Sequence, residues 1–435
     1  MMRIALISGM LAGAVASAGA DNWTSWRGDA AGSGGLGKGG APREFSAEKN
    51  LLWKTKLPGV GCSTPVVWED RIILTSEDGD QDCVVAYDWK GKELWRKTLG
   101  AKRPGRGQRV GSGANSSPVT DGKHVFVYFK SGTVAALTLD GKKVWQTNLI
   151  KKYGPDTLWW DQGTSPVLTD GHLVIAVMQN GHAEKESPEA RPDSSFLVAF
   201  EKESGDVAWK TTRQFKLTME TGDAYTTPHV LDIDGKETVV TWGADHLTGH
   251  DAGTGEQLWI CGGFNPNQEK YWRVIASSTV ANGICVVPYG RAGFMAGIRM
   301  GGSGDITKSA WLWKRELAGT DAASPAARDG KVYLLVDRGK KRGRMECLDA
   351  VTGKTIWEEN LPKGVATYYG SPLVAGDALY CPREDGSIMT ARITNDGLEE
   401  IRENKLGETV ISSPAVVDGK LLIRGREHLY CFGES

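Results

Sequence analysis

The sequence predicts an all-β fold, an eight-bladed β-propeller of four-stranded antiparallel blades in a ring closed by the N-terminal strand. Two sequence markers, which recur with a period of about fifty residues, predict this fold. The first is a glycine followed four residues later by a tryptophan, in the segments Gly91–Trp95, Gly141–Trp145, Gly205–Trp209, Gly255–Trp259 and Gly353–Trp357. The second is a pair of small residues before a proline, in Ser63–Pro65, Ser116–Pro118, Thr164–Pro166, Thr226–Pro228, Ala323–Pro325, Gly370–Pro372 and Ser412–Pro414, with Ser277–Thr279 in the one gap.

Each repeat unit carries four short strand signals. An apolar run such as 66–68 follows the small-small-proline marker, and a turn such as Asp121-Gly122 separates it from a second apolar run such as 124–128. Asp-Gly pairs between apolar runs are typical of hairpins. A third run, which carries a segment such as Ala86-Tyr87-Asp88, follows, and the fourth strand holds the tryptophan. No long segment combines a 3.6-residue apolar period with helix caps, so no long helix is predicted.

Eight units begin near residues 63, 116, 164, 226, 277, 323, 370 and 412. The last unit ends at 429–432 without a tryptophan strand, whereas an extra tryptophan strand, Leu51–Leu57, precedes the first unit. We therefore expect Leu51–Leu57 to complete the last blade and close the ring. The fourth-strand tryptophans are expected to be structural and to pack between neighbouring blades; they are Trp53, Trp95, Trp145, Trp209, Trp259, Trp313 and Trp357.

The chain divides into three predicted parts: a signal peptide at 1–20, an N-terminal extension at 21–50 and the propeller at 51–435. Arg3, an apolar run at 4–15 and Ala18-Gly19-Ala20 indicate a cleavable secretory signal. The apolar run is too short to span a membrane, and no cysteine at the cleavage site could carry a lipid anchor. Residues 29–44 are rich in glycine and are predicted to be a surface linker. We expect a periplasmic or secreted monomer.

Charge and cysteine content exclude several classes of function. The chain has 52 basic and 53 acidic residues and a formal net charge of −1, which argues against nucleic-acid or membrane-surface partners. Its seven cysteines are scattered without a Cys-x-x-Cys motif, so no zinc site is expected. They are predicted to be small buried hydrophobic residues, and one disulfide stays open as an alternative.

No metal site, nucleophile or acid–base pair is predicted, and therefore no catalytic residue. Asp78, Asp80 and Asp82 alternate, but the glycine and glutamate of a calcium-binding EF-hand are missing. His246 and His250 are four residues apart in a strand context, without the helix of a zinc protease motif.

The tight turns between first and second and between third and fourth strands lie at one end of the propeller, which we call the tight-turn face. The loops from second to third strands and between blades are predicted to be long and to lie at the other end, the long-loop face. Scaffolds place recognition on such loops. The candidate site for a protein, small-molecule or anionic ligand consists of residues where between-blade loops reach the channel: Trp160, Asp161, Gln162, Asp223, Tyr225, Arg273, Asp321 and Tyr369. The alternative is that these residues only plug the channel.

Two basic stretches are predicted on opposite sides of the ring. One contains Lys102, Arg103, Arg106 and Arg109, and the other contains Arg338, Lys340, Lys341, Arg342 and Arg344. The simpler interpretation is that both stretches are solvated loops. The alternative is that they bind an anionic polymer that bridges the face.

The repeat, with its Ala-x-Asp and Gly-Lys-x-x-Trp segments, resembles that of pyrroloquinoline-quinone (PQQ)-like β-propellers, which share the quinoprotein alcohol dehydrogenase-like fold. The resemblance covers roughly 50–433. Trp23–Gly28 and Ile423–Cys431 look like segments of exported PQQ-like repeat proteins, similar to the propeller lipoprotein of the outer-membrane β-barrel assembly machinery. The resemblance implies either a binding propeller or a dehydrogenase that uses PQQ and calcium.

The chain departs from both relatives, and the missing cysteine pair and the missing acid clusters favour the binding propeller over the dehydrogenase. The chain has no adjacent cysteine pair, which quinoprotein alcohol dehydrogenases carry over the quinone, and no anchoring cysteine like that of the assembly lipoprotein. We therefore expect an exported, non-catalytic binding or scaffold propeller without a cofactor. The alternative is a PQQ- and calcium-dependent oxidoreductase.

Overall fold

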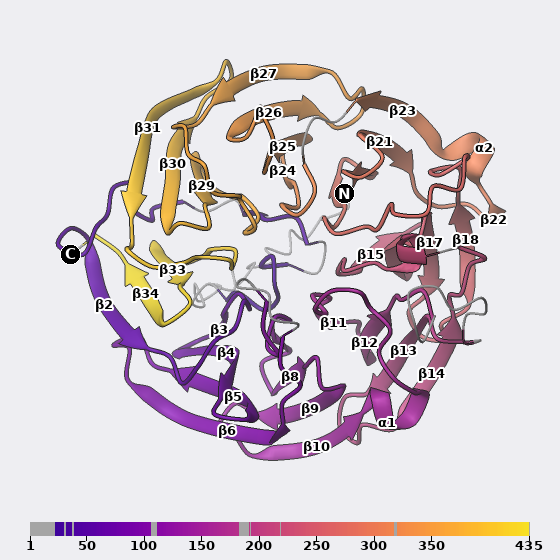
Figure 1. Cartoon of the computed structure of the whole chain (residues 1–435), viewed down its shortest axis with the longest axis horizontal. Coiled ribbons are helices and arrows are strands. Elements are labelled where there is room, and N and C mark those ends of the chain that lie inside the picture. The colour runs from indigo at the N-terminus through magenta and orange to yellow at the C-terminus, as the bar shows by residue number, and fades with distance from the viewer. Residues whose placement is uncertain are drawn as a thin grey trace, which may run out of the picture.

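The computed structural model describes residues 22–29, 32–36, 39–105, 111–181, 191, 193–217, 219–316 and 320–434. Eight sheets surround a central channel (Figure 1), and this arrangement confirms the predicted eight-bladed β-propeller. The predicted signal peptide, Gly37, Arg106 and Arg109 lie outside the described residues. Within the described ranges, no helix has both the length and the apolar character that a membrane crossing requires.

Each blade is an antiparallel sheet whose strands run in order from the channel to the rim. Blades 1 to 4 consist of β3 (Val66–Trp68), β4 (Arg71–Asp78), β5 (Gln81–Tyr87) and β6 (Glu93–Ala101); β7 (Val119–Thr120), β8 (His124–Tyr128), β9 (Thr133–Thr138) and β10 (Lys143–Asn148); β11 (Val167–Leu168), β12 (His172–Val177), β13 (Phe196–Glu201) and β14 (Val207–Thr212); and β15 (His229–Ile233), β16 (Lys236–Gly243), β17 (His246–Asp251) and β18 (Gln257–Cys261).

Blades 5 to 8 consist of β19 (Thr279–Ala281), β20 (Ile284–Tyr289), β21 (Phe294–Arg299) and β23 (Trp311–Glu316); β24 (Ala326–Arg328), β25 (Lys331–Leu335), β26 (Arg344–Asp349) and β27 (Thr355–Asn360); β28 (Leu373–Ala375), β29 (Ala378–Pro382), β30 (Ser387–Ile393) and β31 (Leu398–Lys405); and β32 (Ala415–Val417), β33 (Lys420–Arg424), β34 (His428–Phe432) and β2 (Leu51–Lys56). Two short strands, β1 (Gly35–Leu36) and β22 (Gly304–Asp305), add in parallel to β28 and β18. The helical elements are α1 (Leu149–Tyr153), α2 (Thr307–Ala310) and the 3₁₀ turn η1 (Met219–Gly222).

The two ends of the ring meet in blade 8, as the sequence predicts. The outer strand β2 pairs with β34 in an antiparallel register that joins Leu51 to Phe432 and Lys56 to His428. Figure 1 shows these strands side by side at the rim. Closure removes the open sheet edges at which propellers would otherwise aggregate.

The glycine–tryptophan marker records a contact between neighbouring blades. In five pairs, a methyl group on the glycine would come within 2.4–2.7 Å of the indole ring of the preceding blade; the pairs are Trp53–Gly91, Trp95–Gly141, Trp145–Gly205, Trp209–Gly255 and Trp313–Gly353. The five indole N–H groups also donate to backbone carbonyls of the next blade. The tryptophan therefore needs a glycine opposite it, one blade further on, which explains why both recur with the same period.

Trp357 departs from this pattern, because the atoms nearest to Gly397, in the blade after it, belong to Glu359. Trp259 departs from it as well. The blade that follows it carries the insertion at 300–310 where the others have a glycine turn. Its ring instead packs on Gly249 of its own blade, where a methyl group would come within 2.2 Å.

The small-small-proline marker forms a second ring of contacts, around the channel. The backbone N–H of the residue before the proline donates to the hydroxyl of the equivalent residue in the next blade, at 2.9–3.0 Å in seven consecutive pairs. The hydroxyl of Thr64 closes the circle by donating to the carbonyl of Ser413 at 3.1 Å. We call this set the hydroxyl belt; its members are Thr64, Ser117, Ser165, Thr227, Ser277, Ser324, Ser371 and Ser413.

The belt corrects the predicted alignment of the fifth unit by one residue. Ser277 occupies the position before proline, so the marker there is Ala276-Ser277-Ser278 and not Ser277-Ser278-Thr279. Ser278 stands where the other units have proline, and its hydroxyl hydrogen-bonds with the His229 ring at 2.8 Å.

The prediction of a surface linker at 29–44 is wrong for the described residues. Ala41 is buried, and Phe45, which follows the segment, packs on Phe432 with ring centroids 4.4 Å apart. Glycine is needed because the segment passes close to other groups: a methyl group at Gly35 would lie 2.1 Å from the Ala327 carbonyl oxygen.

The N-terminal segment, residues 22–29, 32–36 and 39–45, contacts blades on both sides of the channel. Trp23 exchanges two backbone hydrogen bonds with Val67 in blade 1. The Arg27 guanidinium is buried and donates to the Pro325 carbonyl, at the start of blade 6, at 3.1 Å. The segment therefore links blades that are far apart along the ring.

The long-loop face is built mainly from between-blade connections. These are long, as predicted, but most loops from second to third strands are short, such as 79–80 in blade 1 and 244–245 in blade 4. Only blades 3 and 6 carry longer ones, at 178–195 and 336–343. The insertion at 300–310 lies between a third and a fourth strand, so it is an exception on the tight-turn face.

We expect Trp145→Ala to lower the free energy of unfolding by about 3–5 kcal/mol, because the ring is buried between blades. Trp160→Ala should cost much less, since that side chain is 38% exposed. Urea denaturation of both variants measures the difference. Equal losses would show that the rim tryptophans are not the main contacts between blades.

A second prediction concerns Ser117→Ala, which removes one hydroxyl of the belt. This change leaves the buried N–H of Thr64 without its acceptor, so it should destabilise the fold by roughly 1–3 kcal/mol. Ser303→Ala, at an exposed position, is the matched control. If chemical denaturation gives the two variants the same stability, the belt contributes nothing measurable.

Candidate functional site

A cavity of about 550 Å³ occupies the channel within the long-loop face. Seven of the eight belt residues line it, together with side chains from the between-blade loops. This volume is in the range of sites that enclose small molecules or short segments of chain. The N-terminal segment contributes Trp26 to the lining.

The structure brings six of the eight predicted site residues together on this cavity. They are Trp160, Asp161, Tyr225, Arg273, Asp321 and Tyr369. The other two, Gln162 and Asp223, are buried behind the wall. Asp223 accepts the N–H groups of Trp159 and Asn180, and Gln162 donates to Ser116 and Thr164, so both hold the loops in place.

Trp160 stands at the mouth of the cavity in a corner formed by charged groups. Its indole N–H donates to Glu220 at 2.8 Å, and its backbone N–H donates to the Tyr225 hydroxyl at 3.1 Å. The Arg273 guanidinium forms an ion pair with Glu220 and lies 5.2 Å from the centre of the Trp160 ring. These contacts fix an aromatic surface beside a cation, an arrangement suited to recognition.

On the adjacent part of the wall, two arginines meet one carboxylate. Arg291 and Arg338 lie 3.1 and 2.9 Å from the same oxygen of Asp321. Asp337, directly behind, accepts the backbone N–H groups of Asp321, Ala322 and Ala323 through one oxygen. Its other oxygen is buried and has no hydrogen-bond partner among the described residues.

Asp161 is neutralised within the wall. Lys130 donates to it, and both side chains are nearly inaccessible to solvent. Lys130 also donates to the Pro104 carbonyl at 2.9 Å, so this pair ties the loop before blade 2 to the loop before blade 3. A buried ion pair of this kind fixes geometry more than it adds stability.

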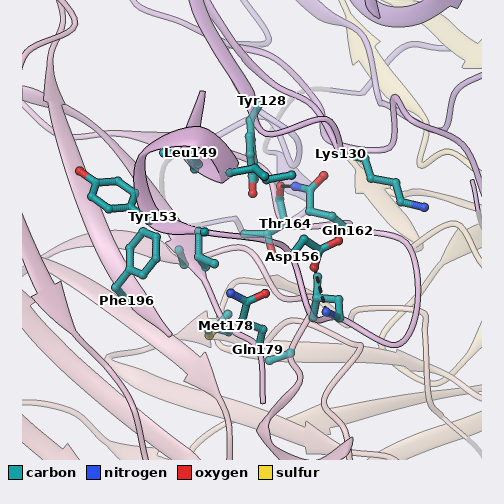
Figure 2. A pocket seen from close by; sticks show the side chains of 16 residues that line it. Tyr128, Lys130, Leu149, Tyr153, Asp156, Gln162, Thr164, Met178, Gln179 and Phe196 are labelled. Carbon is teal, nitrogen blue, oxygen red and sulfur yellow. Dashed lines mark hydrogen bonds between the residues drawn. The ribbon is translucent and has the colours of Figure 1, made fainter. Parts of the chain in front are cut away.

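A second cavity lies beside this pair, between blades 2 and 3. Figure 2 shows it with Tyr128 at the top of the view and Gln179 at the bottom. Its volume of about 30 Å³ has room for a water molecule, so we interpret it as a packing gap and not as a ligand site.

The basic side chains of the two stretches differ in their ion-pair partners and in their exposure. Lys102 pairs with Glu77, and Arg103 pairs with Asp156. In the second stretch, Arg342 donates to backbone carbonyls and Arg344 pairs with Glu358, whereas Lys340 and Lys341 are exposed. Among the described residues of the two stretches, the exposed lysines are those on the blade 6 side of the face.

The two histidines considered for metal binding, His246 and His250, take part in packing. In the described part of the chain, no group of three or more His, Cys, Asp or Glu side chains is arranged to hold a metal ion. The His246 ring stacks on Phe215 with centroids 3.8 Å apart, and His250 is buried in its sheet. None of the seven cysteines forms a disulfide; six are buried, and Cys62 lines the large cavity.

Sequence reasoning missed Trp26, Arg291 and Asp337, and placed Arg338 only in a basic loop. Arg291 lies in the short turn 290–293 between β20 and β21, which no repeat marker singles out. Asp337 lies two residues after the second strand of its blade and so reaches the long-loop face; that position was the one available signal. Nothing in the repeat indicates that Trp26 returns to the channel.

Comparison with known proteins shows which families and proteins the chain is similar to. The family model described as outer membrane protein assembly factor BamB matches residues 45–191 and 303–425. A curated protein with the same name, from Yersinia pestis, is 24% identical over 401 residues, which are 88% of each chain.

Solved structures extend the likeness at the level of fold. BamB from Moraxella catarrhalis superposes with a TM-score of 0.59 at 14% identity, covering 88% of this chain and 97% of that one. A quinohemoprotein alcohol dehydrogenase from Comamonas testosteroni gives a TM-score of 0.67 at 14% identity, covering 95% and 81%. A europium-containing methanol dehydrogenase gives 0.69 at 11% identity, covering 95% and 98%.

The buried carboxyl of Asp337 predicts a pH dependence. Burial raises its pKa to about 6, against about 4 in an unfolded chain. The folded protein then binds more protons between these values, so this group's contribution to stability falls as pH rises from 4 to 6 and is constant above about 7. The stability of Asp337→Asn relative to the natural protein should increase by roughly 2 kcal/mol over that window. Urea titrations from pH 4.5 to 8 measure it, and a difference independent of pH would contradict the interpretation.

Proposed function

Because the chain belongs to the family described as outer membrane protein assembly factor BamB, we propose that it is an exported, non-catalytic propeller that binds a protein partner through its long-loop face. The names of its relatives point to proteins of outer-membrane assembly as the class of partner. A periplasmic location and a cleaved signal peptide are part of this proposal.

The observation that carries the proposal is that exposed apolar and aromatic side chains stand on the between-blade loops, and that loops of the same face supply cationic side chains to the cavity wall. Val365 is 92% exposed, Tyr271 is 56% exposed and Trp160 is 38% exposed, all on between-blade loops. Arg273 and Arg338 line the cavity, and Arg273 lies over the Trp160 ring. Aromatic residues and arginines dominate the energy of protein interfaces, whereas the opposite face presents mostly short turns.

The channel residues do not fit a quinone with calcium. A calcium site needs several converging oxygen ligands, but the carboxylates here already have donors. Asp321 holds two arginines, Asp161 holds Lys130, and Asp337 turns one oxygen to three backbone N–H groups. Cys62 is the one cysteine on the cavity wall, so no cysteine pair could cover a quinone.

Site-specific photo-crosslinking in the native host tests the binding face. A photoreactive phenylalanine analogue at Val365 or Tyr271 should give adducts with a partner protein, because both side chains project from the long-loop face. The same analogue at Asp170 or Asp329, in exposed tight turns, is the control. Adducts that form only from the turn positions would place the partner on the opposite face and overturn the proposal.

The absence of cofactor chemistry is tested on the purified protein. After PQQ and calcium are added, we expect no reduction of an acceptor dye in the presence of alcohols or sugars. The protein's absorbance spectrum should also show no stoichiometric quinone. Dye reduction that requires both additions would favour the dehydrogenase instead.

A further inference from the structure

The hydroxyl belt presents hydrogen-bond donors to the cavity. Seven of its hydroxyl oxygens line the cavity, and each accepts a backbone N–H from the preceding blade. A serine or threonine hydroxyl carries one hydrogen and two lone pairs. Among the described residues, none of these seven hydroxyls donates to a protein acceptor, so their hydrogens are available to a ligand.

The arginines add charged donors above the belt. Arg291 and Arg338 share one oxygen of Asp321, so two positive charges meet a single carboxylate. The Nε atoms of Arg273 and Arg291 are buried and have no hydrogen-bond partner among the described residues. Asp321 and Asp161 already have cationic partners, and among the described residues of the lining the carboxylate oxygen without a partner is one of Asp337, which lies behind Asp321. Such a lining favours a ligand rich in acceptors, and a carboxylate is the best match to a guanidinium.

The shape of the cavity favours a chain end. Trp26 lines it and also lines a smaller cavity with Thr120 and Leu168, at the ends of two inner strands near the tight-turn face. It therefore lies on the inner side of the cavity, away from the long loops. The walls carry Trp160, Tyr225 and Tyr369, which suit an apolar side chain next to the charged group. A terminus can enter such a space, whereas a loop would have to bring two chains through the mouth.

We propose that the cavity binds the C-terminal carboxylate of an extended partner polypeptide, with the carboxylate at Arg273, Arg291 and Arg338 and within reach of the belt hydroxyls. The inference rests on the proposed function, since it names the part of the partner that the long-loop face receives. An apolar last residue is expected, because the aromatic wall lies beside the arginines.

The test compares free and capped chain ends on the natural protein. A pool of N-acetylated random hexapeptides with free carboxyl ends is passed over the immobilised protein, beside the same pool made as C-terminal amides. Mass spectrometry identifies what is retained. Retention of acid peptides with apolar last residues, at least about tenfold over the amides, is expected for the loss of a charge-assisted hydrogen bond. Equal retention, or none from either pool, overturns the proposal.

A pair of variants locates the carboxylate. Arg291→Gln should weaken binding of a retained peptide about tenfold. Lys340→Gln removes the same charge from an exposed position nearby that does not line the cavity, and should change affinity less than about twofold. Equal effects of the two variants would mean that general attraction, and not the cavity, holds the peptide.

Two further ligands, benzoate and PQQ, distinguish a peptide chain end from other carboxylates that the same arginines could bind. Benzoate that binds as tightly as the peptides would make this a small-acid site and overturn the chain-end proposal. Competition by PQQ at stoichiometric amounts would overturn both this inference and the proposed function. Crosslinks from the long-loop face together with equal retention of acids and amides would overturn the inference alone.

Discussion

In seven of the eight blades, a backbone N–H beside the channel donates to a hydroxyl of the next blade, and this repeated contact sets how closely the inner strands approach. At the junction of blades 8 and 1 the Thr64 hydroxyl donates to the Ser413 carbonyl. Seven of the eight belt residues are buried and Thr227 is half-buried, so each bond satisfies a backbone N–H that has little access to water. Serine and threonine suit the position because they are small and can accept a backbone N–H. The proline that follows has no N–H to leave unsatisfied. Every between-blade loop ends at this belt, so the belt fixes the positions from which the loops build the cavity.

The rim contact complements the belt. A tryptophan of one blade covers a glycine of the next, and the indole N–H reaches a carbonyl there. Both contacts join neighbours along the ring, so their residues recur with the blade period. This explains why the sequence alone predicts blade number, strand order and the closing role of the N-terminal strand. The ring, not the single blade, is the unit that these markers describe.

The site was less predictable, because its key contacts link residues with no periodic relation. Arg291 comes from a short turn in blade 5 and Arg338 from a loop in blade 6, and only the fold brings both to Asp321. Asp223 and Gln162 have the polar character expected of site residues, but their partners lie in adjacent loops, so they are buried supports. The glycine-rich segment resembles a linker by composition, although its glycines allow close passage beside the blades.

Amide hydrogen exchange with and without a partner or retained peptide tests most directly the claim that the belt presents a binding site on the long-loop face. We predict slow exchange at the belt amides in the free protein. Binding should slow exchange in the loops at 156–163, 271–275, 337–342 and 365–369, while the turns near Asp121, Asp170, Asp329 and Asp418 stay unchanged. Protection confined to those turns, or fast exchange at the belt amides of the free protein, would contradict the account.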